Sequence, residues 1–415
     1  MPRLIFVNRF FFPDHSATSQ ILSDLAFDLA AGGREVHVVA SRQIYDDAKA
    51  TLPDRDLVDG VHVHRVASTQ FGRRALVGRA IDYLSFYRSV GRRLAELARP
   101  GDLVIAKTDP PLVAIVAMTA ARRAGAHLVN WLQDVYPETA VVLRVPLMRG
   151  PVAAALSLLR DRTLRQAVAT VVIGEAMAQT VAGRGAPAAA IHVIPNWCDD
   201  ERIVPMAASA NPLRQTWHLT DKFVLGYSGN LGRAHEFDTV LAAAERLRDD
   251  PRLVFLMIGG GKGFDDLKTI IERRALGASF RFMQYRDRSE LPYSLGVPDA
   301  HWLSLNPKLE GLLLPSKFYG IAAAGRPIVF IGDCNGEVAR LVQQHACGVA
   351  IAPGDAATLV GVLRRWANEP AMVAAMGSRA RKMLEANFTR RRGLARWREL
   401  LDQLAQTAPN RSPQT

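Results

Sequence analysis

The stretch NPKLEGLLLPSKFYGIAAAGRP, residues 306–327, predicts the fold of the second half of the chain. It lies between two short apolar runs that are typical of buried strands. Within it, Pro315 and Ser316 predict the start of a short helix. Gly325 suits the left-handed residue that ends a helix, and Pro327 prevents the helix from continuing. The order strand, loop, helix, strand is typical of an α/β domain.

Charged side chains surround the start of this short helix. Lys308 and Glu310 lie in the loop before it, and Lys317 follows Ser316 in its first turn. Free N–H groups and the helix dipole make such an end a natural site for anions. We therefore expect an active cleft here. An ordinary capped helix is the alternative interpretation.

Two further loops of the second half combine glycines with a cation at the end of an apolar strand. The run FVLGY at residues 223–227 leads into SGNLGRAH, which contains Gly229, Asn230 and Arg233. The run LVFLMI leads into Gly259 and Gly260, and Lys262 follows. Glycine-containing loops between a strand and a helix, with an Arg or Lys, are typical of phosphate binding.

The first forty residues predict the same kind of unit. Apolar strands at residues 4–8 and 35–40 flank a helical pattern, and the loop before that helix contains His15, Ser16 and Thr18. This loop lies at the carboxyl end of a strand, where open parallel sheets bind ligands. It is not a G-x-G-x-x-G loop, and this weakens any oxidoreductase interpretation.

A carboxylate follows another predicted strand of the first half. Residues 127–132, HLVNWL, read as a buried strand, and Asp134 lies in the loop QDVYPE that comes after it. Such loops often carry catalytic residues. The alternative is that Asp134 caps the next helix.

Residues 71–94, FGRRALVGRAIDYLSFYRSVGRRL, form a basic and aromatic amphipathic segment. A segment of this kind can lie on an anionic bilayer. The alternative is a helix that packs its apolar face on the sheet and leaves its arginines in water. The candidate membrane residues are Arg73, Arg74, Arg79, Arg88, Arg92 and Arg93.

The composition is globular and basic. Of 415 residues, 49% are hydrophobic and 22% are charged, and the formal net charge of +12 predicts an anionic partner. No nucleic-acid-binding module is recognisable, so we expect no nucleic acid partner. Three widely spaced cysteines predict a reducing compartment. We expect no signal peptide and no segment that spans a bilayer.

The pattern of strands and helices predicts two successive α/β domains. We expect an N-terminal domain at residues 1–205 and a C-terminal domain at residues 206–390, after an irregular linker near residues 200–220. A helix at residues 391–406 is expected to return to the first domain. The polar tail at residues 407–415 is expected to be disordered.

Taken together and in this order, six motifs resemble the family 4 retaining GT-B glycosyltransferases, in particular bacterial enzymes of exopolysaccharide and O-antigen assembly of the colanic-acid type. The resemblance covers nearly the whole chain, and the motifs are FPD (12–14), WLQDVYPE (131–138), IPNWCD (194–199), YSGNLGR (227–233), IGGG (258–261) and PSKFYGIAAAGRP (315–327).

The resemblance implies an α/β, GT-B fold with two Rossmann-like domains facing across a cleft, and C-terminal helices that close the structure. It implies a hexosyl- or N-acetylhexosaminyltransferase that moves a sugar from a UDP- or GDP-sugar, with retention and without a metal. The implied acceptor is a polyprenyl-diphosphate-linked glycan. Together with the basic aromatic segment, this predicts a cytoplasmic protein, peripheral on the anionic inner face of the plasma membrane.

The resemblance also assigns roles to residues. It places Gly229, Asn230, Arg233, Ser316 and Lys317 near the donor diphosphate. It places Gly259, Gly260 and Lys262 on the nucleotide side, and His15, Ser16 and Thr18 on the acceptor side. Asp134 and Glu310 are the candidate catalytic carboxylates, because an oxocarbenium-like sugar is stabilised by negative charge.

The sequence departs from the family pattern where a second Glu is usual on the helix, since Gly320 and Phe318 stand there. Glu337 is a candidate substitute for that Glu, and Arg233 is the candidate replacement for the Arg that the family has where Asn230 lies here. Two other functions therefore stay open. One is a nucleotide-sugar epimerase of the same fold, and the other is a non-catalytic, membrane-associated scaffold.

Overall fold

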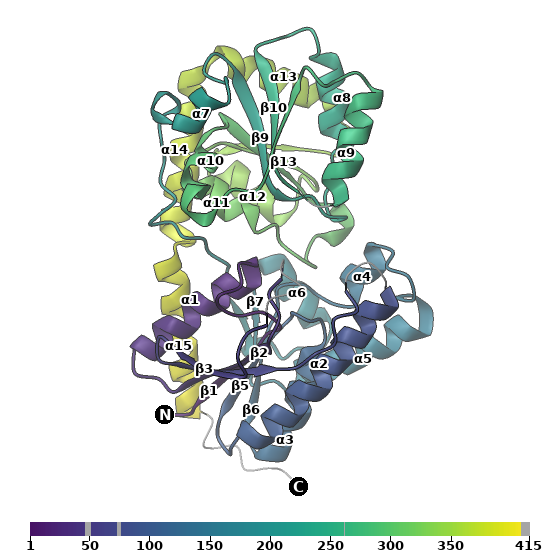
Figure 1. Ribbon diagram of the computed structural model, residues 1–415, viewed down its shortest axis with the longest axis vertical. Coiled ribbons are helices and arrows are strands. Elements are labelled where there is room, and N and C mark those ends of the chain that lie inside the picture. Colours follow the sequence, from purple (N-terminus) through teal and green to yellow (C-terminus); the bar gives the residue numbers. More distant parts are fainter. Residues whose placement is uncertain (46–50, 73–75, 261, 408–415) are drawn as a thin grey trace. The chain divides into compact units, whose positions relative to one another are not determined.

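The computed structural model describes residues 1–45, 51–72, 76–260 and 262–407. The chain forms two compact units (Figure 1). Unit 1 contains residues 1–195, 311–313 and the segment that begins at Gly393. Unit 2 contains residues 196–310 and 314–392, so it begins at Asn196 rather than at the expected position 206. The expected disordered tail lies outside the described residues beyond Thr407.

Unit 1 is built on an eight-stranded sheet in the order β3-β4-β2-β1-β5-β6-β7-β8. Neighbouring strands are parallel, except that β3 is antiparallel to β4. The strands are β1 (Leu4–Val7), β2 (Val36–Ser41), β3 (Arg55–Val58), β4 (Val61–Val66), β5 (Leu103–Lys107), β6 (His127–Trp131), β7 (Ala169–Val172) and β8 (Ile191–Val193).

The α-helices of unit 1 connect these strands. They are α1 (Ala17–Ala31), α2 (Leu76–Leu97), α3 (Val113–Ala124), α4 (Glu138–Val142), α5 (Gly150–Gln166) and α6 (Glu175–Gly183), with a 3-10 turn η1 (Ala188–Ala190). Phe86, Val90 and Leu94 of α2 are buried in the core against the sheet. The apolar strands are buried on both faces, as parallel sheets require.

The last helix, α15 (Arg390–Thr407), packs within unit 1 from Gly393 onward. The ring of its buried Trp397 lies 4.5 Å from the ring of Trp131, measured between centroids. Arg398 of α15 pairs with Asp28 of α1 at 3.2 Å. These contacts hold α15 against the rest of unit 1, although the chain reaches this helix from unit 2.

Unit 2 is built on a six-stranded, all-parallel sheet in the order β11-β10-β9-β12-β13-β14. This is the doubly wound order, in which the direction of strand addition reverses between the first and fourth strands. The strands are β9 (Phe223–Asn230), β10 (Leu253–Gly260), β11 (Phe280–Met283), β12 (Ala300–Ser304), β13 (Ile328–Ile331) and β14 (Gly348–Ile351).

Helices cover both faces of this second sheet (Figure 1). The core on one face includes residues from α8, α9 and α13, and the core on the other face includes residues beside α7 and α10. The helices are α7 (Pro212–Thr216), α8 (Asp238–Arg246), α9 (Lys262–Arg273), α10 (Leu291–Gly296), α11 (Lys317–Ala323), α12 (Glu337–Gln344), α13 (Ala356–Asn368) and α14 (Pro370–Asn387), with 3-10 turns η2 (Ala208–Ala210), η3 (Arg288–Glu290) and η4 (Pro307–Leu309).

The two predicted α/β sheets are confirmed, and so is the short helix of the opening stretch. That helix is α11, and Gly325 follows it with φ of +63°. Ser316 is the residue before this helix, as predicted. Its side chain makes no capping hydrogen bond to the helix backbone. Edge strand β3 was not predicted, because its residues are mostly exposed and lack an apolar run.

Candidate functional site

The doubly wound order of unit 2 identifies one edge of its sheet as the ligand-binding edge. Ligands bind outside the carboxyl ends of the strands, at the point where the strand order reverses. In unit 2 this point lies between β9 and β12. The end of β9 and the segments that follow β9 and β12 contain many of the predicted site residues, from Gly229 to Arg233 and from Glu310 to Lys317.

Lys317 is a half-buried cation at this edge. Its Nζ lies 3.3 Å from Nε2 of His235 and 5.2 Å from the centre of the Tyr227 ring. Nδ1 of His235 lies 2.8 Å from the carbonyl oxygen of Ser304. Because that oxygen can only accept, Nδ1 carries the hydrogen, and Nε2 accepts one from Lys317.

The electrostatics of this pair favour an anion. Loss of water lowers the pKa of Lys317 to about 8, and no carboxylate among the described residues opposes that shift. Loss of water, and secondarily the charge of Lys317, lowers the pKa of His235 to about 4. His235 is therefore neutral at pH 7. An ammonium group has three donors, so Lys317 keeps capacity for a phosphate oxygen.

Two predicted glycines let the backbone approach this cation. Gly229 has φ of +125°, and a Cβ on it would lie 2.7 Å from Cε of Lys317. Gly259 has φ of +143°, and a Cβ on it would collide with the carbonyl oxygen of Gly229. Both positions thus require glycine for conformation and for space. A Cβ on Gly260 would lie 3.3 Å from the ring of Tyr285.

The other predicted donor residues are less closely engaged. Asn230, the last residue of β9, is exposed, and so are Arg233 and Ser316 in loops of unit 2. Lys262 begins α9, but its side chain lies outside the described residues, as does Gly261. Their assigned roles stay predictions.

Glu310 has a structural role at the start of α12. Its Oε1 accepts a hydrogen bond from the backbone N–H of Glu337 at 2.8 Å. A Cβ on Gly336 would lie 2.6 Å from Oε2, so glycine makes room for this carboxylate. Burial raises the pKa of Glu310. A carboxylate at a helix N-terminus stabilises that helix, and a catalytic role for Glu310 stays a prediction.

Asp134 lies at the corresponding edge of the sheet of unit 1, in the loop after β6. It forms a backbone bridge with Leu313. Loss of water raises its pKa to about 6, while a hydrogen bond from Thr108 acts in the opposite direction. The charge of Asp109 adds to the rise. The residue that precedes α4 is Pro137, so the alternative that Asp134 caps the next helix is wrong.

Residues that the sequence did not single out gather around Asp134. The charges of Asp109 and Asp134 help to raise the pKa of Tyr83, although burial is the main cause. The guanidinium of Arg9 lies 5.3 Å from the Tyr83 ring. The charge of Asp134 also reaches Tyr136, where burial again is the main cause of a raised pKa. Carboxylates, phenols and a guanidinium therefore share this edge.

The three predicted acceptor-side residues have different environments. The hydroxyl of Ser16 donates to the buried carboxylate of Asp14 at 2.5 Å. The carbonyl of Thr18 accepts from Nζ of the buried Lys107 at 3.0 Å. His15 is exposed. The Ser16 side chain and the Thr18 backbone thus support the fold around the start of α1, and His15 is the most exposed of the three.

The predicted membrane arginines differ in their exposure and in their partners. Arg88 and Arg92 are exposed on α2, whereas Arg93 donates to Glu96 at 2.8 Å. Arg79 is close enough to lower the pKa of Tyr83 and Tyr136, where burial raises it more strongly. Arg73 and Arg74 lie outside the described residues.

The described residues contain neither a membrane span nor a metal cluster. None of the described helices is long and apolar enough to cross a membrane. No group of three or more His, Cys, Asp or Glu side chains in the described ranges could hold a metal ion.

Both halves of the chain match known glycosyltransferase families. Residues 17–197 match the family described as "Glycosyl transferase 4-like domain", and residues 211–383 match the family described as "Glycosyl transferases group 1". The chain belongs to the family 4 glycosyltransferases of the GT-B fold. The resemblance that the sequence motifs indicated is confirmed at this level.

Two bacterial proteins with similar sequences are described as glycosyltransferases. WbjE of Pseudomonas aeruginosa, described as a probable glycosyltransferase, is 24% identical over 72% of this chain and 73% of its own. WcaI of Escherichia coli K12, described as a candidate colanic acid biosynthesis glycosyl transferase, is 29% identical over 59% of this chain and 61% of its own.

Solved structures share the glycosyltransferase fold. Anabaena HepE in complex with UDP-glucose matches with a TM-score of 0.72 and 16% identity, over 97% of this chain and all of HepE. Sucrose-phosphate synthase of Thermosynechococcus elongatus matches with a TM-score of 0.79 and 16% identity, over 98% of this chain and all of that one.

Proposed function

We propose that this glycosyltransferase moves a sugar from a UDP- or GDP-sugar to a glycan acceptor in the assembly of a cell-surface polysaccharide. The observation that carries the proposal is the Lys317 ammonium, which lies against the Gly229 backbone at the ligand-binding edge of unit 2 without a carboxylate partner. HepE, of the same fold, was solved with UDP and with UDP-glucose. The names of WbjE and WcaI support the enzyme class, and that of WcaI supports the biosynthetic setting.

In the proposed reaction, the bond between the sugar carbon and the diphosphate oxygen breaks, and a bond from an acceptor oxygen to that carbon forms. The leaving diphosphate gains negative charge, which Lys317 stabilises from a site already shaped for it. Positioned donors of this kind are worth roughly 3–4 kcal/mol each. The leaving phosphate takes the acceptor proton, and the configuration of the sugar is retained.

The proposed roles divide between the two units. Unit 2 holds the nucleotide sugar through Lys317 and the loops at Gly229 and Gly259, without a metal ion. Unit 1 binds the acceptor near Asp134, whose carboxylate stabilises positive charge at the sugar. The pKa of about 6 keeps most of this carboxyl ionised at pH 7. We propose a hexosyl or N-acetylhexosaminyl donor and a polyprenyl-diphosphate-linked acceptor.

We also propose that unit 1 rests on the anionic inner face of the plasma membrane. Val77, Ile81 and Leu84 of α2 are 67%, 40% and 65% exposed, and their spacing continues into the exposed Arg88 and Arg92. Large apolar side chains thus stand beside arginines on one helix face, which suits the boundary between headgroups and acyl chains.

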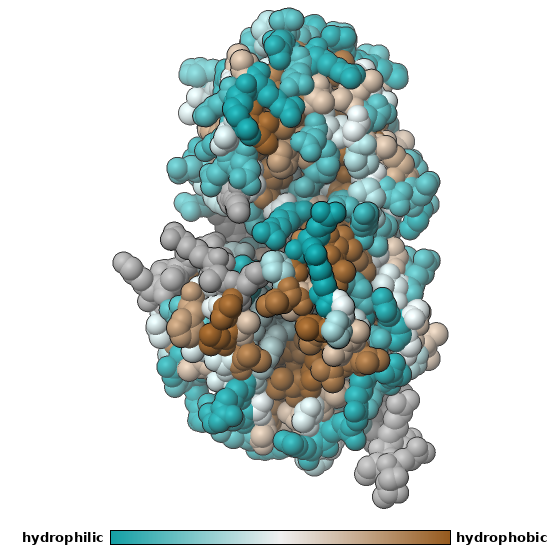
Figure 2. Space-filling view, turned by 90° about the vertical axis from the view of Figure 1, so that its right-hand side faces the viewer, coloured by the Kyte–Doolittle hydropathy of each residue, from teal (hydrophilic) through white to brown (hydrophobic). Residues whose placement is uncertain are grey.

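A second element of unit 1 also carries exposed apolar side chains. Figure 2 shows apolar side chains, in brown, gathered on the face of unit 1 that carries α4 and α5. Val152, Leu158 and Leu159 of α5 are all exposed, and Arg162 follows on the same helix. Exposed apolar patches rimmed by charge are typical of membrane or protein contact. Such a position would bring the chain to a lipid-linked acceptor.

The experiment that tests the proposed function uses the purified full chain and a panel of UDP- and GDP-sugars, with and without a lipid extract that contains lipid-linked glycans. We expect release of nucleoside diphosphate that requires the acceptor and continues in EDTA. Isomerised sugar without transfer would instead identify an epimerase. Nucleotide-sugar binding without turnover on any acceptor would identify a scaffold. Loss of turnover in EDTA would contradict only the metal-independent mechanism.

A further inference from the structure

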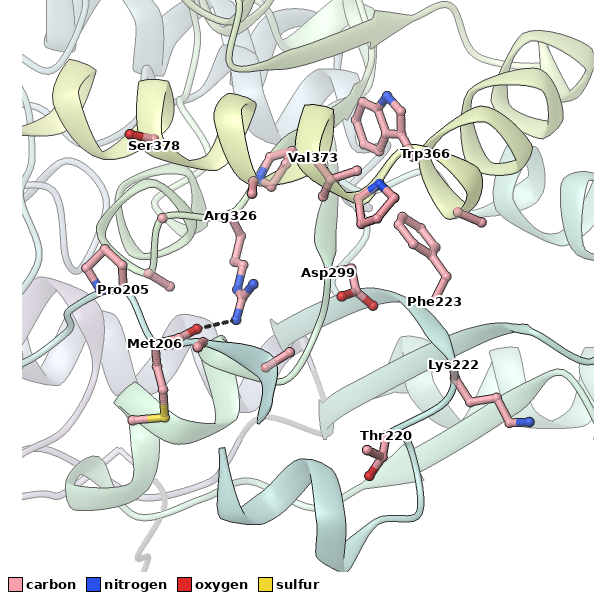
Figure 3. A pocket seen from close by; sticks show the side chains of 18 of the residues that line it. Pro205, Met206, Thr220, Lys222, Phe223, Asp299, Arg326, Trp366, Val373 and Ser378 are labelled. Atoms are coloured by element: carbon pink, nitrogen blue, oxygen red, sulfur yellow. Dashed lines mark hydrogen bonds between the residues drawn. The ribbon is translucent and has the colours of Figure 1, made fainter. Parts of the chain in front are cut away.

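Unit 2 contains a cavity of about 690 Å³ at the amino-terminal edge of its sheet (Figure 3). Phe223, which begins β9, Asp299, which precedes β12, and Pro327, which precedes β13, all line it. The end of α13 and the first turns of α14 close it from the other side. Its volume falls in the range of small-molecule sites, about 300–1,000 Å³.

This cavity is distinct from the proposed donor site. It lies where the strands of unit 2 begin, whereas Gly229 and Lys317 lie where they end. Strand β9 has eight residues, and at about 3.3 Å per residue it separates the two edges by roughly 25 Å. A molecule held in the cavity would not touch a donor bound at Lys317, so this inference does not depend on the proposed function.

One wall of the cavity carries a guanidinium group without an acidic partner. Nη2 of Arg326 donates to the carbonyl oxygens of Met206 at 2.8 Å and Gly296 at 2.6 Å, and Figure 3 shows the first of these bonds. Its buried Nε has no hydrogen-bond partner among the described residues. Burial lowers the pKa of Arg326, whereas the charge of Asp299 raises it and the charge of Arg214 lowers it further.

The other charges that line the cavity are already compensated within the described residues. Lys222 pairs with Asp221 at 2.8 Å, Arg252 with Asp250 at 2.8 Å, and Arg381 with Glu385 at 2.7 Å.

The carboxylate of Asp299 is compensated as well. It accepts two hydrogen bonds from Arg214, at 3.1 and 3.0 Å, and a third from the backbone N–H of Val224. Among the charged side chains described on this lining, Arg326 is thus the one that forms no ion pair, although the charge of Asp299 acts on it from a distance. A charge withdrawn from water is unfavourable unless it is paired, so an anion would be bound favourably here.

The opposite wall is apolar. Trp366 and Val373 lie close to Phe223 in Figure 3, and Trp366 is only 3% exposed. Pro370 also belongs to the lining. Such a wall suits a flat apolar group, because aromatic and aliphatic side chains supply most of the contact area in ligand pockets. The cavity thus combines an apolar wall with one cation that forms no ion pair among the described residues.

We propose that this cavity is a binding site for a small molecule that carries one anionic group, a carboxylate, sulfonate or phosphate, on an aromatic body. The anion pairs with Arg326, and the ring packs on Phe223 and Pro370, two accessible apolar residues of the lining. Nothing in the donor site or the acceptor site is needed for this binding.

The test uses 1-anilinonaphthalene-8-sulfonate as the probe, with titration calorimetry on the full chain. Ala374, an exposed residue of α14, lines the cavity, whereas the exposed Ala375 beside it does not. We expect Ala374→Trp to weaken the saturable binding of the probe at least tenfold, and Ala375→Trp to leave it unchanged. Saturating UDP should not displace the probe. Equal affinities of the wild type and Ala374→Trp would overturn the proposal.

A second comparison tests the cation. N-phenyl-1-naphthylamine has the same ring system without the sulfonate, so we expect it to bind at least tenfold more weakly than the sulfonate to the wild type. Arg326→Gln should abolish that difference. A neutral probe that binds as tightly as the sulfonate would overturn the assignment of an anion. Unchanged near-ultraviolet circular dichroism controls for folding, and Ala374→Trp keeps the test valid if Arg326→Gln does not fold.

Discussion

Lys317 combines burial, a neutral partner and an adjacent glycine, and these features together favour the proposed phosphate binding. Its amino group donates to His235 and lies over the ring of Tyr227, and both of these neighbours are neutral. No carboxylate of the described residues raises its pKa. The absence of a side chain at Gly229 leaves room for Cε of Lys317, which would lie 2.7 Å from a Cβ at that position. Such a cation is costly for the folded protein, and this cost is expected where a ligand supplies the missing charge.

We therefore expect Lys317→Ala to lower kcat/KM for the donor about 10²- to 10³-fold, the usual effect of removing one positioned donor. The fold should remain, because the substitution removes an unpaired buried charge. Lys308→Ala is the matched control, since Lys308 is an exposed lysine of the same loop. Initial rates over a range of donor concentrations provide the measurement. A Lys317→Ala enzyme as active as the control would remove the phosphate assignment.

Asp134 connects activity and stability through its raised pKa of about 6. Between about pH 4 and pH 6 the folded state binds more protons at this site than the unfolded state. Stability from this group therefore falls as the pH rises through that window. A shift of about two pH units corresponds to roughly 3 kcal/mol at most.

Asp134→Asn should therefore be more stable than the wild type at pH 7.5, by about 1–3 kcal/mol, and the difference should shrink at pH 4. Activity should be lost at both pH values, and wild-type activity should decline below pH 6. Urea unfolding at the two pH values and rate–pH profiles measure these effects. An Asn variant that is less stable at pH 7.5 than the wild type would contradict the assigned pKa.

The sequence predicted some site residues and missed others for physical reasons. Gly229, Gly259 and Lys317 were predicted because glycine and lysine beside the carboxyl ends of buried strands are typical of phosphate-binding loops. His235 was missed, because only the tertiary structure brings its ring to Lys317. The catalytic role predicted for Glu310 stays a prediction, and its hydrogen bond from the first turn of α12 was missed because it joins residues 27 positions apart.

At the scale of elements, buried strands were the most predictable part of the fold. Continuous apolar runs in β1, β5 and β10 are typical of parallel strands, since these strands are covered on both faces. Strand β3 lacks such a run, but the Asp59-Gly60 pair that follows it is a sequence signal for a hairpin turn. Asp59 and Gly60 both have positive φ, as the two-residue turn between antiparallel strands requires.

Helix α2 packs an apolar face on the sheet, as the second interpretation of the basic aromatic segment predicts, and the membrane interpretation stays a prediction. Its residues Phe86, Val90 and Leu94 pack on the sheet, while Val77, Ile81 and Leu84 remain exposed. The sequence could not separate these two apolar faces, because a helix of 22 residues with apolar groups on more than one side fits both patterns.

We expect the double substitution Arg88→Glu and Arg92→Glu on α2 to weaken binding to anionic liposomes, and to do so more at low salt than at high salt. Each removed charge is worth about 1 kcal/mol near such a surface, so the partition coefficient should fall at least 30-fold. Arg364→Glu with Arg365→Glu on α13 is the matched control. Liposome co-sedimentation provides the measurement, and equal losses in both variants would contradict a specific role for α2.

At the scale of the whole molecule, both units use the same plan. Each sheet reverses its strand order, between β1 and β5 in unit 1 and between β9 and β12 in unit 2, and each places its candidate residues at the carboxyl ends of these and neighbouring strands. The plan was predictable from alternating strands and helices. The division after Pro195, and the return of residues 311–313 to unit 1, were not, because backbone pairing over long separations leaves no local signal.

The net charge of +12 is also a property of the whole chain. It suits a protein whose proposed donor, acceptor and membrane surface are all anionic. A nucleotide bound only by the folded state stabilises it by about 2.7 kcal/mol at a hundredfold excess over Kd. The nucleotide, UDP or GDP, that raises the melting temperature more identifies the donor class.

The most direct measurement is a crystal structure of the full chain with that nucleoside diphosphate. We predict that a phosphate oxygen lies within hydrogen-bonding distance of Nζ of Lys317, with the diphosphate against the backbone at Gly229. In Lys317→Ala, the Kd of the same nucleotide should rise at least tenfold. A diphosphate bound in unit 1, or in the Arg326 cavity with no contact to Lys317, would contradict the proposed donor site.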